Sequence, residues 1–200
     1  MIIKHLGRVE YGPTWRAMQA FTAAREETTP DELWVLEHPP VFTLGQAGKR
    51  EHLLRQTDIP VVSIDRGGQI TYHGPGQVVI YVLVDLKRRG YGVKELVNRM
   101  EQAVIDLLGK NGIRANRLRG APGVYVEGAK IAALGLRVKQ GRSYHGLALN
   151  VDMDLAPFSL INPCGYPGMA VTQTRSLGMS DTPSIVGEEL ARRLAQSLVS

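Results

Sequence analysis

The spacing of apolar residues after residue 120 constrains the fold of this chain most strongly. Apolar and polar residues alternate through three successive segments, 123–127, 130–138 and 143–151. An alternation with a period of two is typical of strands, and Gly128 and the pair Gln140–Gly141 provide short turns between the segments. Strands joined by such short turns pair antiparallel, so this region favours an α+β fold over a doubly wound parallel sheet.

The rest of the chain is predicted to contain three helices and three further strands. Helical spacing and capping signals predict three helices, over 13–27, over 93–110 and from Thr182 to near the C-terminus. Short apolar runs predict further strands at 33–36, 61–64 and 77–86. The sequence therefore predicts an α+β fold of mixed, largely antiparallel sheets flanked by helices, in a single domain over residues 1–200.

The overall composition is that of an ordinary globular chain. Hydrophobic residues make up 44% and charged residues 22% of the 200 residues, which excludes a disordered chain. The longest apolar run, 78–84, is too short to cross a bilayer as a helix, and the N-terminus lacks the apolar core of a secretory signal. We therefore expect a cytoplasmic protein with no membrane partner.

The use of cysteine and histidine narrows the possible chemistry. The single cysteine, Cys164, excludes a disulfide framework, a cysteine zinc site and a Cys-x-x-Cys redox pair. The five histidines are dispersed along the chain, so we expect no metal site. The glycine-containing segment 45–50 is not a phosphate loop, because its spacing is wrong and no Ser or Thr follows Lys49.

The net charge of +5 leaves two kinds of partner to consider, nucleic acid and an acidic protein or small anion. Aromatic residues are only 6% of the chain, and no run interleaves them with Lys and Arg as a stacking platform for nucleic acid does. The basic residues are also scattered, so most of them are expected to be solvated. We therefore expect no nucleic acid partner, and a minority of the bases to steer an acidic partner.

Cys164 is the first candidate for a catalytic residue. It lies in the sequence Asn-Pro-Cys-Gly-Tyr, within a long segment, 152–178, that is rich in Gly and Pro and reads as an ordered loop. A free cysteine is most often a small buried apolar residue. A loop can instead present the thiol, and Gly165 leaves room for a substrate carbonyl, so this segment alone leaves both roles open.

Lys130 is the second candidate. It lies in a predicted apolar strand, on the same face as Ala132 and Leu134, where its ammonium would be desolvated. An edge lysine with its head in water is the alternative that this segment also allows. A turn centred on Gln140–Gly141 places Lys130 opposite Val151, where the loop that carries Cys164 begins. That loop can fold back onto Lys130, and a lysine beside a cysteine is a usable pair of base and nucleophile.

The segment 65–77 contains residues that let a ligand approach the backbone closely. It reads Asp-Arg-Gly-Gly-Gln-Ile-Thr-Tyr-His-Gly-Pro-Gly-Gln and joins two apolar runs. Five of these residues are Gly or Pro, more than a plain connection needs, so we interpret the segment as a binding loop. His73 in this segment and His145 further along are weak candidates by themselves, because a lone histidine is more often structural.

Together these motifs resemble those of the lipoyl(octanoyl) transferases. The resemblance runs in order from about Leu33 to Gly178, whereas the first thirty residues and the last helix are generic. It is carried by Glu-His-Pro-Pro-Val-Phe-Thr-Leu-Gly-Gln at 37–46, Arg-Gly-Gly-Gln-Ile-Thr-Tyr-His-Gly-Pro-Gly-Gln at 66–77, Gly-Ala-Lys-Ile-Ala-Ala-Leu-Gly at 128–135, His-Gly-Leu-Ala-Leu-Asn-Val at 145–151 and Asn-Pro-Cys-Gly at 162–165.

The resemblance implies a fold shared with biotin and lipoate protein ligases, and an octanoyltransferase catalytic domain over residues 1–200. It implies that Cys164 carries an acyl thioester and that Lys130 tunes this thiol. It also implies that three segments line the acyl pocket, namely Arg66, Gly67, Gly68, Gln69, Ile70, Thr71, Tyr72 and His73, then Ala133, Leu134 and Gly135, and then Gly146, Leu147 and Ala148.

The implied activity is the first step of endogenous protein lipoylation. An octanoyl group passes from octanoyl-acyl carrier protein, through the cysteine thioester, to the lysine of a lipoyl domain. The implied partners are acyl carrier protein, the lipoyl domains of 2-oxoacid dehydrogenase complexes and the glycine cleavage H protein. No ATP, metal or cofactor is implied, because the octanoyl-phosphopantetheine of the carrier is itself the donor substrate.

Two other functions remain as alternatives. The first is an ATP-using lipoate or biotin ligase on the same fold, which activates a free acid as an adenylate and does not need Cys164. The second is a small basic nucleic-acid-binding module, which predicts basic residues clustered on one face and no role for Cys164. The cysteine motif favours the transferase over both alternatives.

Overall fold

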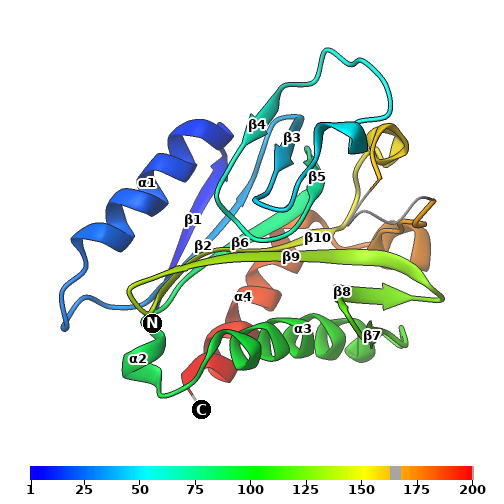
Figure 1. Cartoon of the computed structure of the whole chain (residues 1–200). Coiled ribbons are helices and arrows are strands. Elements are labelled where there is room, and N and C mark those ends of the chain that lie inside the picture. The colour runs from blue at the N-terminus through cyan, green and yellow to red at the C-terminus, as the bar shows by residue number, and fades with distance from the viewer. Residues whose placement is uncertain (163–167, 200) are drawn as a thin grey trace.

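The structure, a computed structural model, describes residues 1–162 and 168–199 (Figure 1). In this part of the chain the strands form two sheets. The larger sheet has the order β1 (Ile2–Arg8), β2 (Glu32–Glu37), β6 (Gln77–Leu83), β10 (Arg142–Asn150), β9 (Ala129–Lys139), β8 (Ala121–Val126) and β7 (Asn116–Leu118). The smaller sheet has the order β4 (Val61–Ser63), β3 (Val41–Leu44) and β5 (Ile70–His73).

The pairing of the strands is mainly antiparallel. Strand β1 runs parallel to β2, and β3 runs parallel to β4, whereas the other described pairs are antiparallel. Strand β6 lies inside the large sheet and is buried along its whole length, as its unbroken apolar run predicts. The predicted α+β class with mixed, largely antiparallel sheets is therefore confirmed.

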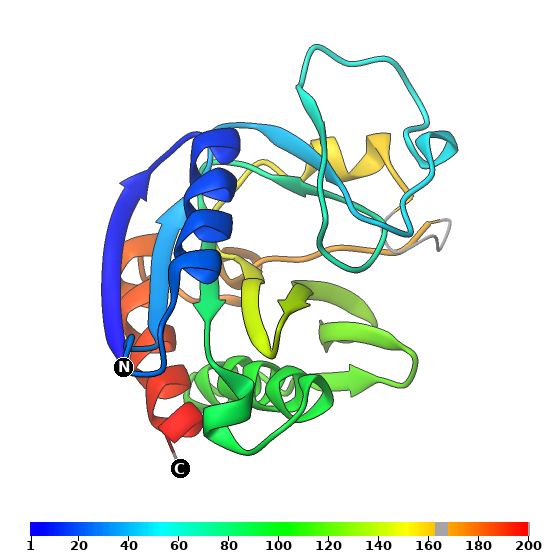
Figure 2. The ribbon, with the colours of Figure 1, turned by 60° about the vertical axis from the view of Figure 1, so that its left-hand side comes forward.

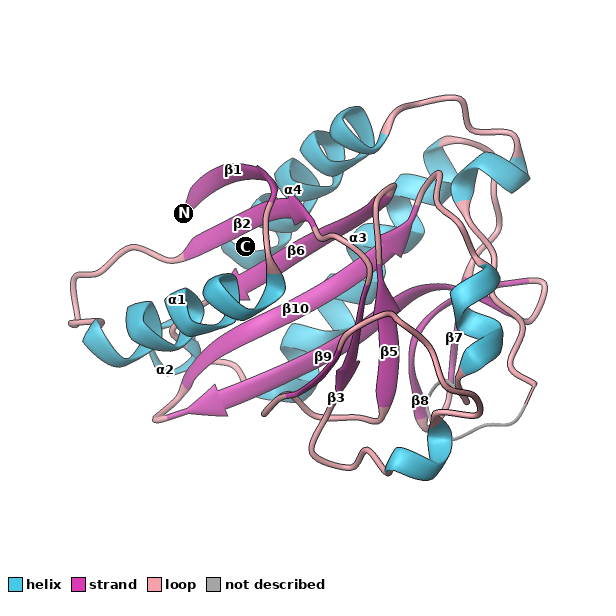
Figure 3. Cartoon of the chain, turned by 90° about the horizontal axis from the view of Figure 1, so that it is seen from above, coloured by secondary structure: helices cyan, strands magenta, loops and turns pink. Residues whose placement is uncertain are grey.

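Helices cover both faces of the large sheet (Figures 1 and 3). The described helices are α1 (Tyr11–Ala24), α2 (Leu86–Arg89), α3 (Val93–Lys110) and α4 (Pro183–Val199), with short 3-10 turns η1 (Arg50–His52), η2 (Ala156–Leu160) and η4 (Thr174–Leu177). Helices α3 and α4 bury apolar residues such as Met100 and Leu190 against the main core on one face. Helix α1 packs through Tyr11 and Met18 on the other face, where the small sheet also lies (Figure 2).

The β9–β10 hairpin forms in the predicted register. Gln140 and Gly141 have φ values of 54° and 82°, the left-handed conformation that a two-residue hairpin turn of this kind requires at both positions. Pairing continues from Arg142 opposite Lys139 as far as Leu149 opposite Ala132. Lys130 then pairs with Val171 rather than Val151, because residues 170–172 lie along this end of β9.

The sequence did not predict several short elements. Strands β1, β3, β5 and β7 are absent from the predicted set, and the strand expected over 77–86 ends at Leu83. Asp85 instead caps α2, because its side chain accepts a hydrogen bond from the amide of Arg88 at 3.1 Å. The segment expected as one loop, 152–178, contains η2 and η4. No described helix combines the length and apolar character needed to span a membrane.

Candidate active site

A pocket lies between the face of the large sheet that carries α1 and the segment that contains β5. The space between them is about 770 Å³ when the part that opens to solvent is included. Thirteen of the sequence-predicted residues line it: Arg66, Gly68, Gln69, Ile70, Thr71, His73, Lys130, Ala133, Leu134, Gly135, Gly146, Leu147 and Ala148. The structure thus brings together all three segments that the sequence singled out for acyl binding.

Small residues on the two hairpin strands make room for the pocket. Ala148 of β10 lies between Ala133 of β9 and Val79 of β6, and all three line the pocket. Gly135 of β9 lets the Arg66 side chain lie close against this strand, because a Cβ at position 135 would lie 2.9 Å from Cδ of Arg66. Since larger side chains at these positions would fill the space, the sheet face itself forms the floor of the pocket.

Arg66 fixes the binding segment over the end of this floor. Its guanidinium is buried and donates hydrogen bonds to the carbonyl oxygen and to Oγ1 of Thr43, at 2.7 Å and 2.9 Å. The amide of Gly67 donates to the carbonyl oxygen of Leu136 on β9 at 2.9 Å. Gly67 therefore ties the segment to the sheet, although it is not among the residues that line the pocket.

Tyr72 is the other predicted residue that does not line the pocket. Its ring instead packs between Phe42 and Phe158, with centroid distances of 5.4 Å and 5.5 Å. This aromatic group belongs to an apolar cluster between the small sheet and η2, and the packing of the Tyr72 ring within that cluster keeps it out of the pocket lining.

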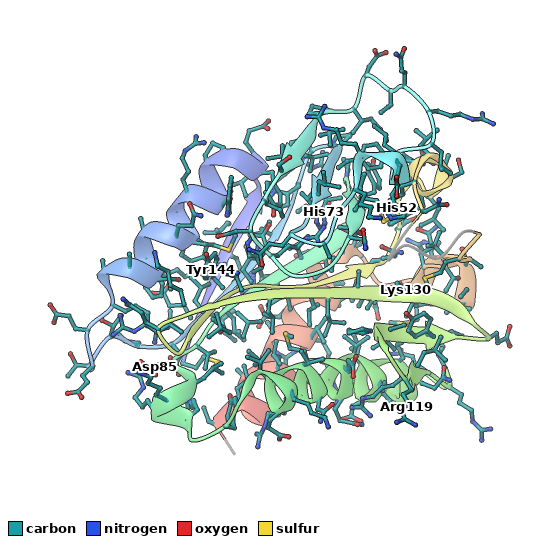
Figure 4. All side chains as sticks on the ribbon, viewed as in Figure 1. His52, His73, Asp85, Arg119, Lys130 and Tyr144 are labelled. Atoms are coloured by element: carbon teal, nitrogen blue, oxygen red, sulfur yellow. The ribbon has the colours of Figure 1, made fainter. Side chains whose placement is uncertain are left out.

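Lys130 lies at one end of the pocket and is buried, with 4% of its surface exposed. Its Nζ donates a hydrogen bond to the carbonyl oxygen of Pro122 at 3.3 Å and lies 5.3 Å from the ring centroid of Tyr125. The structure therefore excludes the edge lysine with its head in water. Figure 4 shows Lys130 near the opposite end of the β9–β10 hairpin from Tyr144.

Strand β8 is shaped to accept the Lys130 side chain. The register of β8 against β9 shifts between Val124 and Tyr125. Gly123, just before this shift, has a φ of 146°, and a Cβ there would lie 2.9 Å from Cε of Lys130. A side chain at this position would push on the lysine, so the glycine leaves the space that the buried ammonium needs.

Cys164 lies outside the described residues, but the chain on each side of it is placed. Before it, the amide of Asn162 donates to the carbonyl oxygen of His52 at 2.9 Å. After it, the amide of Lys130 donates to the carbonyl oxygen of Ala170 at 2.8 Å, and the amide of Thr172 donates to the carbonyl oxygen of Lys130 at 3.0 Å. Residues 170–172, which follow Cys164 in the sequence, are therefore held against Lys130.

Two buried histidines near the pocket are held in their neutral form. Nδ1 of His38 lies 2.6 Å from the carbonyl oxygen of Val9, and its Nε2 lies 2.6 Å from the hydroxyl of Tyr81. The first ring nitrogen must donate, so the second accepts from Tyr81. Burial lowers the pKa of His38 to about 4 and that of His73 to about 3. His73 and Tyr81 line the pocket as uncharged groups.

Asp65 and His145 form a polar pair at the end of the pocket away from Lys130. Nε2 of His145 lies 3.0 Å from Oδ1 of Asp65, which also accepts from the indole of Trp15 at 2.8 Å. Burial disfavours the charge of Asp65, but hydrogen bonds from His145, Tyr144 and Trp15 outweigh it and hold the pKa of this carboxyl well below its usual range. Burial also lowers the pKa of His145, although Asp65 acts against this.

Sequence reasoning missed part of the lining of the pocket. The additional residues are Tyr11, Gln77, Val79, Tyr81, His145, Asn150, Phe158 and Val171. Three of them, Gln77, His145 and Asn150, fell in motifs that the sequence singled out, whereas Tyr11 belongs to a helix with no distinguishing motif. The described residues contain no group of three His, Cys, Asp or Glu side chains placed to hold a metal ion.

The arrangement suits an extended apolar group whose reactive end lies near an amine. The floor of the pocket carries no charge, and Lys130 lies at the end where Ala170 and Thr172 are hydrogen-bonded to it. His73 and His145 line the pocket with their pKa values lowered by burial. The arrangement could support transfer of an acyl group at the Lys130 end, and the floor has room for an alkyl chain.

Comparisons with known proteins agree with this geometry. The model of the lipoyl protein ligase A/B catalytic domain family matches residues 10–198. The chain is 74% identical over 180 residues to a protein named octanoyltransferase from Thiobacillus denitrificans, with 90% of this chain and 83% of that protein covered. It is 65% identical over 197 residues to an octanoyltransferase from Chromobacterium violaceum, with 98% and 95% covered.

Solved structures share the fold at low sequence identity. A lipoate-protein ligase A bound with ATP superposes with a TM-score of 0.78 at 17% identity, covering 99% of this chain and 86% of that one. A biotin protein ligase from Aquifex aeolicus superposes with a TM-score of 0.59 at 12% identity, covering 99% and 69%. The expected fold, shared with lipoate and biotin protein ligases, is therefore confirmed.

Proposed function

Because the chain belongs to the octanoyltransferase family, with a lipoyl protein ligase A/B catalytic domain, we propose that it transfers octanoyl from acyl carrier protein to lipoyl domains. The chain is an acyltransferase of protein lipoylation. The proposal adds the donor, the covalent route and the acceptors. The acceptors are the lipoyl domains of 2-oxoacid dehydrogenase complexes and the glycine cleavage H protein, and the reaction takes place in the cytoplasm.

One observation carries the proposal. Lys130 is buried at the end of a pocket floored by small residues, and residues 170–172, which follow the Cys164 segment, are hydrogen-bonded to it. An ammonium next to a thiol favours the thiolate. A free cysteine with a pKa of about 8.5 is only about 3% ionised at pH 7, so such a neighbour would raise the reactive fraction many-fold.

The first step forms an acyl-enzyme. The thiolate of Cys164 attacks the carbonyl carbon of the octanoyl thioester on the carrier's phosphopantetheine arm. The bond from this carbon to the pantetheine sulfur breaks, and Lys130 gives a proton to the departing sulfur. The products are octanoyl-Cys164, neutral Lys130 and the free thiol of the carrier, so atoms and charge balance.

The second step transfers the octanoyl group to the acceptor. The neutral amine of a lipoyl-domain lysine attacks the carbonyl carbon of octanoyl-Cys164, and Lys130 accepts the proton that the nitrogen loses. The bond from the carbonyl carbon to the sulfur of Cys164 breaks. An amide forms on the acceptor, and the enzyme returns to its starting state with a thiolate and an ammonium.

The acyl chain contributes binding free energy along the floor of the pocket. Burial of a methylene is worth about 0.8 kcal/mol, so an octanoyl chain gains about 5 kcal/mol. Ala133, Gly135 and Ala148 provide the space for it. The proposal assigns no resident cofactor and no metal, since the donor thioester already contains the activation that a ligase takes from ATP.

A two-tube reaction tests this function. The first tube contains octanoyl-acyl carrier protein, an apo lipoyl domain and EDTA, and the second contains free octanoate, Mg·ATP and the same lipoyl domain. The proposal predicts octanoylation of the lipoyl domain in the first tube and none in the second. Octanoylation in the second tube alone would show an ATP-using ligase and overturn the proposal.

A further inference from the structure

Most of the described arginines that lack both an ion pair and a side-chain hydrogen bond lie at one end of the molecule. Most of the other arginines are neutralised locally, as Arg88 and Arg89 are by Asp31. Within residues 1–162 and 168–199, the arginines with neither an ion pair nor a side-chain hydrogen bond are Arg16, Arg50, Arg55, Arg114 and Arg119. All five are exposed, and four of them lie in two short segments, 50–55 and 114–119.

The two segments lie on either side of the Lys130 end of the pocket. In the first, the amide of Leu54 donates to the carbonyl oxygen of Leu160 at 2.8 Å, which holds this segment beside the residues that precede Cys164. The second leads through Leu118, paired with Ala121, to the carbonyl oxygen of Pro122 that accepts from Lys130. Figure 4 shows His52, Lys130 and Arg119 at the same end of the molecule.

Each segment also exposes a leucine next to its arginine. Leu54 is 50% exposed and precedes Arg55, and Leu118 is 41% exposed and precedes Arg119. These are two of the large apolar side chains that the described surface leaves in water. Apolar residues together with arginine are typical of the contact surfaces of protein partners.

Acidic side chains of the same segments do not cancel this charge. Glu51 is the acid within 50–55, and it pairs with Lys49 at 3.4 Å. The segment 114–119 contains no acid of its own, and Glu101 of α3 pairs with Arg117 rather than Arg119. The positive charge of Arg55 and Arg119 is therefore available to a partner.

We propose that Leu54–Arg55 and Leu118–Arg119, with Arg50 and Arg114 beside them, form the docking surface for the acidic protein that carries the octanoyl donor. This inference rests on the proposed function, because it places that partner where its thioester can reach the Lys130 end of the pocket. The arginines steer the encounter, and the two leucines provide the apolar contact.

A protein fits this surface better than a nucleic acid. Neither segment contains a Phe, Tyr or Trp on which a base could stack. Each segment also exposes a leucine beside its arginine, from which a phosphate backbone would gain nothing. Binding of nucleic acid at this surface is therefore an outcome that the test can reveal but that the chemistry does not favour.

Two double charge-reversal variants, which change the net charge of the protein by the same amount, provide the test. Arg55→Glu with Arg119→Glu changes the proposed surface, and Arg16→Glu with Lys139→Glu changes exposed cations on α1 and at the far end of β9. Each variant is assayed with octanoyl-carrier protein and with a small octanoyl-pantetheine thioester. We expect the first variant to lose at least tenfold in kcat/KM with the carrier at low salt and to stay within twofold of wild type with the small thioester.

The controls distinguish a failure of the proposed docking surface from a failure of the proposed function. Equal losses in both variants would mean that net charge, not this surface, guides the carrier, and no loss in the first variant would overturn the proposal. Wild-type protein that uses neither donor would contradict the proposed function instead. In that case, titration calorimetry of octanoyl-carrier protein with the same variants would test the docking surface independently of activity. Binding of an RNA oligomer in place of the carrier would also overturn the proposed docking surface.

Discussion

The backbone amide of Gly123 donates a 2.9 Å hydrogen bond to Oε1 of Glu101, a buried carboxylate on α3. The other oxygen of this carboxylate pairs with Nε of Arg117 at 2.9 Å. Gly123 in turn leaves space for Cε of Lys130, and the neighbouring Pro122 accepts from its Nζ. Helix α3 therefore fixes the strand that receives the proposed catalytic lysine, without touching the pocket itself.

Loss of this anchor is predicted to affect turnover more than binding. Glu101→Ala leaves the buried amide of Gly123 unpaired, which costs about 1–3 kcal/mol, and frees the Lys130 ammonium to move. We expect kcat to fall about tenfold with little change in KM, and Glu101→Gln to restore most of the activity because its oxygen still accepts. Asp106→Ala, on the exposed side of α3, is the matched control. Equal changes in kcat and KM, or no rescue by glutamine, would mean that Glu101 is only structural.

Lys130→Met is predicted to abolish both half-reactions while the protein stays folded. Methionine matches the apolar surroundings of the buried side chain, and the loss of a positioned acid and base costs about 10²–10⁴-fold in rate. Single-turnover acylation by octanoyl-carrier protein measures the first half-reaction. Lys139→Met, at the exposed end of the same strand, should react like wild type. Acylation of Lys130→Met at the wild-type rate would remove Lys130 from the mechanism.

The floor of the pocket is predicted to set the length of the acyl chain. Ala148→Leu grows into the pocket and removes space for about two methylenes, which corresponds to about 1.6 kcal/mol. The ratio of kcat/KM for octanoyl to that for hexanoyl should therefore fall about tenfold. Ala132→Leu, on the helix-covered face of β9, should lower the melting temperature without changing this ratio. An unchanged ratio in Ala148→Leu would place the acyl chain elsewhere.

Stability is predicted to fall as the solution becomes mildly acidic. His38 and His73 have folded pKa values of about 4 and about 3, against about 6.5 in the unfolded chain, so only the unfolded state takes up protons between these values. Each group then costs on the order of 2 kcal/mol of stability by pH 5. Urea unfolding at pH 7.5, 6 and 5 measures this loss. A urea midpoint that stays constant from pH 7.5 to pH 5 would contradict the assignment.

The sequence predicted those parts of the fold that depend on local pattern. The β9–β10 hairpin followed from the alternation of apolar residues and from Gln140–Gly141, and α4 begins at Pro183 after the cap at Thr182, as expected. Strand β1 was missed because it is an edge strand that is largely exposed and shows no alternation. Strands β3 and β5 were missed because they are four residues long and form a sheet only with each other and β4.

The residues of the candidate site could likewise be predicted only where a local sequence pattern marked them. The residues in glycine-rich motifs were found, because close contacts such as that of the Arg66 side chain with Gly135 require glycine and leave a signal in the sequence. Tyr11 was not found as a site residue, and the role of Asp65 within the segment 65–77 was not predicted, because both depend on contacts with residues far away in the chain. The bond from Trp15 to Asp65 joins residues fifty positions apart, and no local pattern records it.

The central claim is that the octanoyl group passes through Cys164, and intact-mass spectrometry tests it most directly. The protein is incubated with octanoyl-carrier protein and EDTA without an acceptor, beside a Cys164→Ala variant. The account predicts one octanoyl increment on the wild-type chain, removed by neutral hydroxylamine and absent from the variant. An increment that persists in Cys164→Ala, or octanoylation of a lipoyl domain by that variant at the wild-type rate, would contradict it.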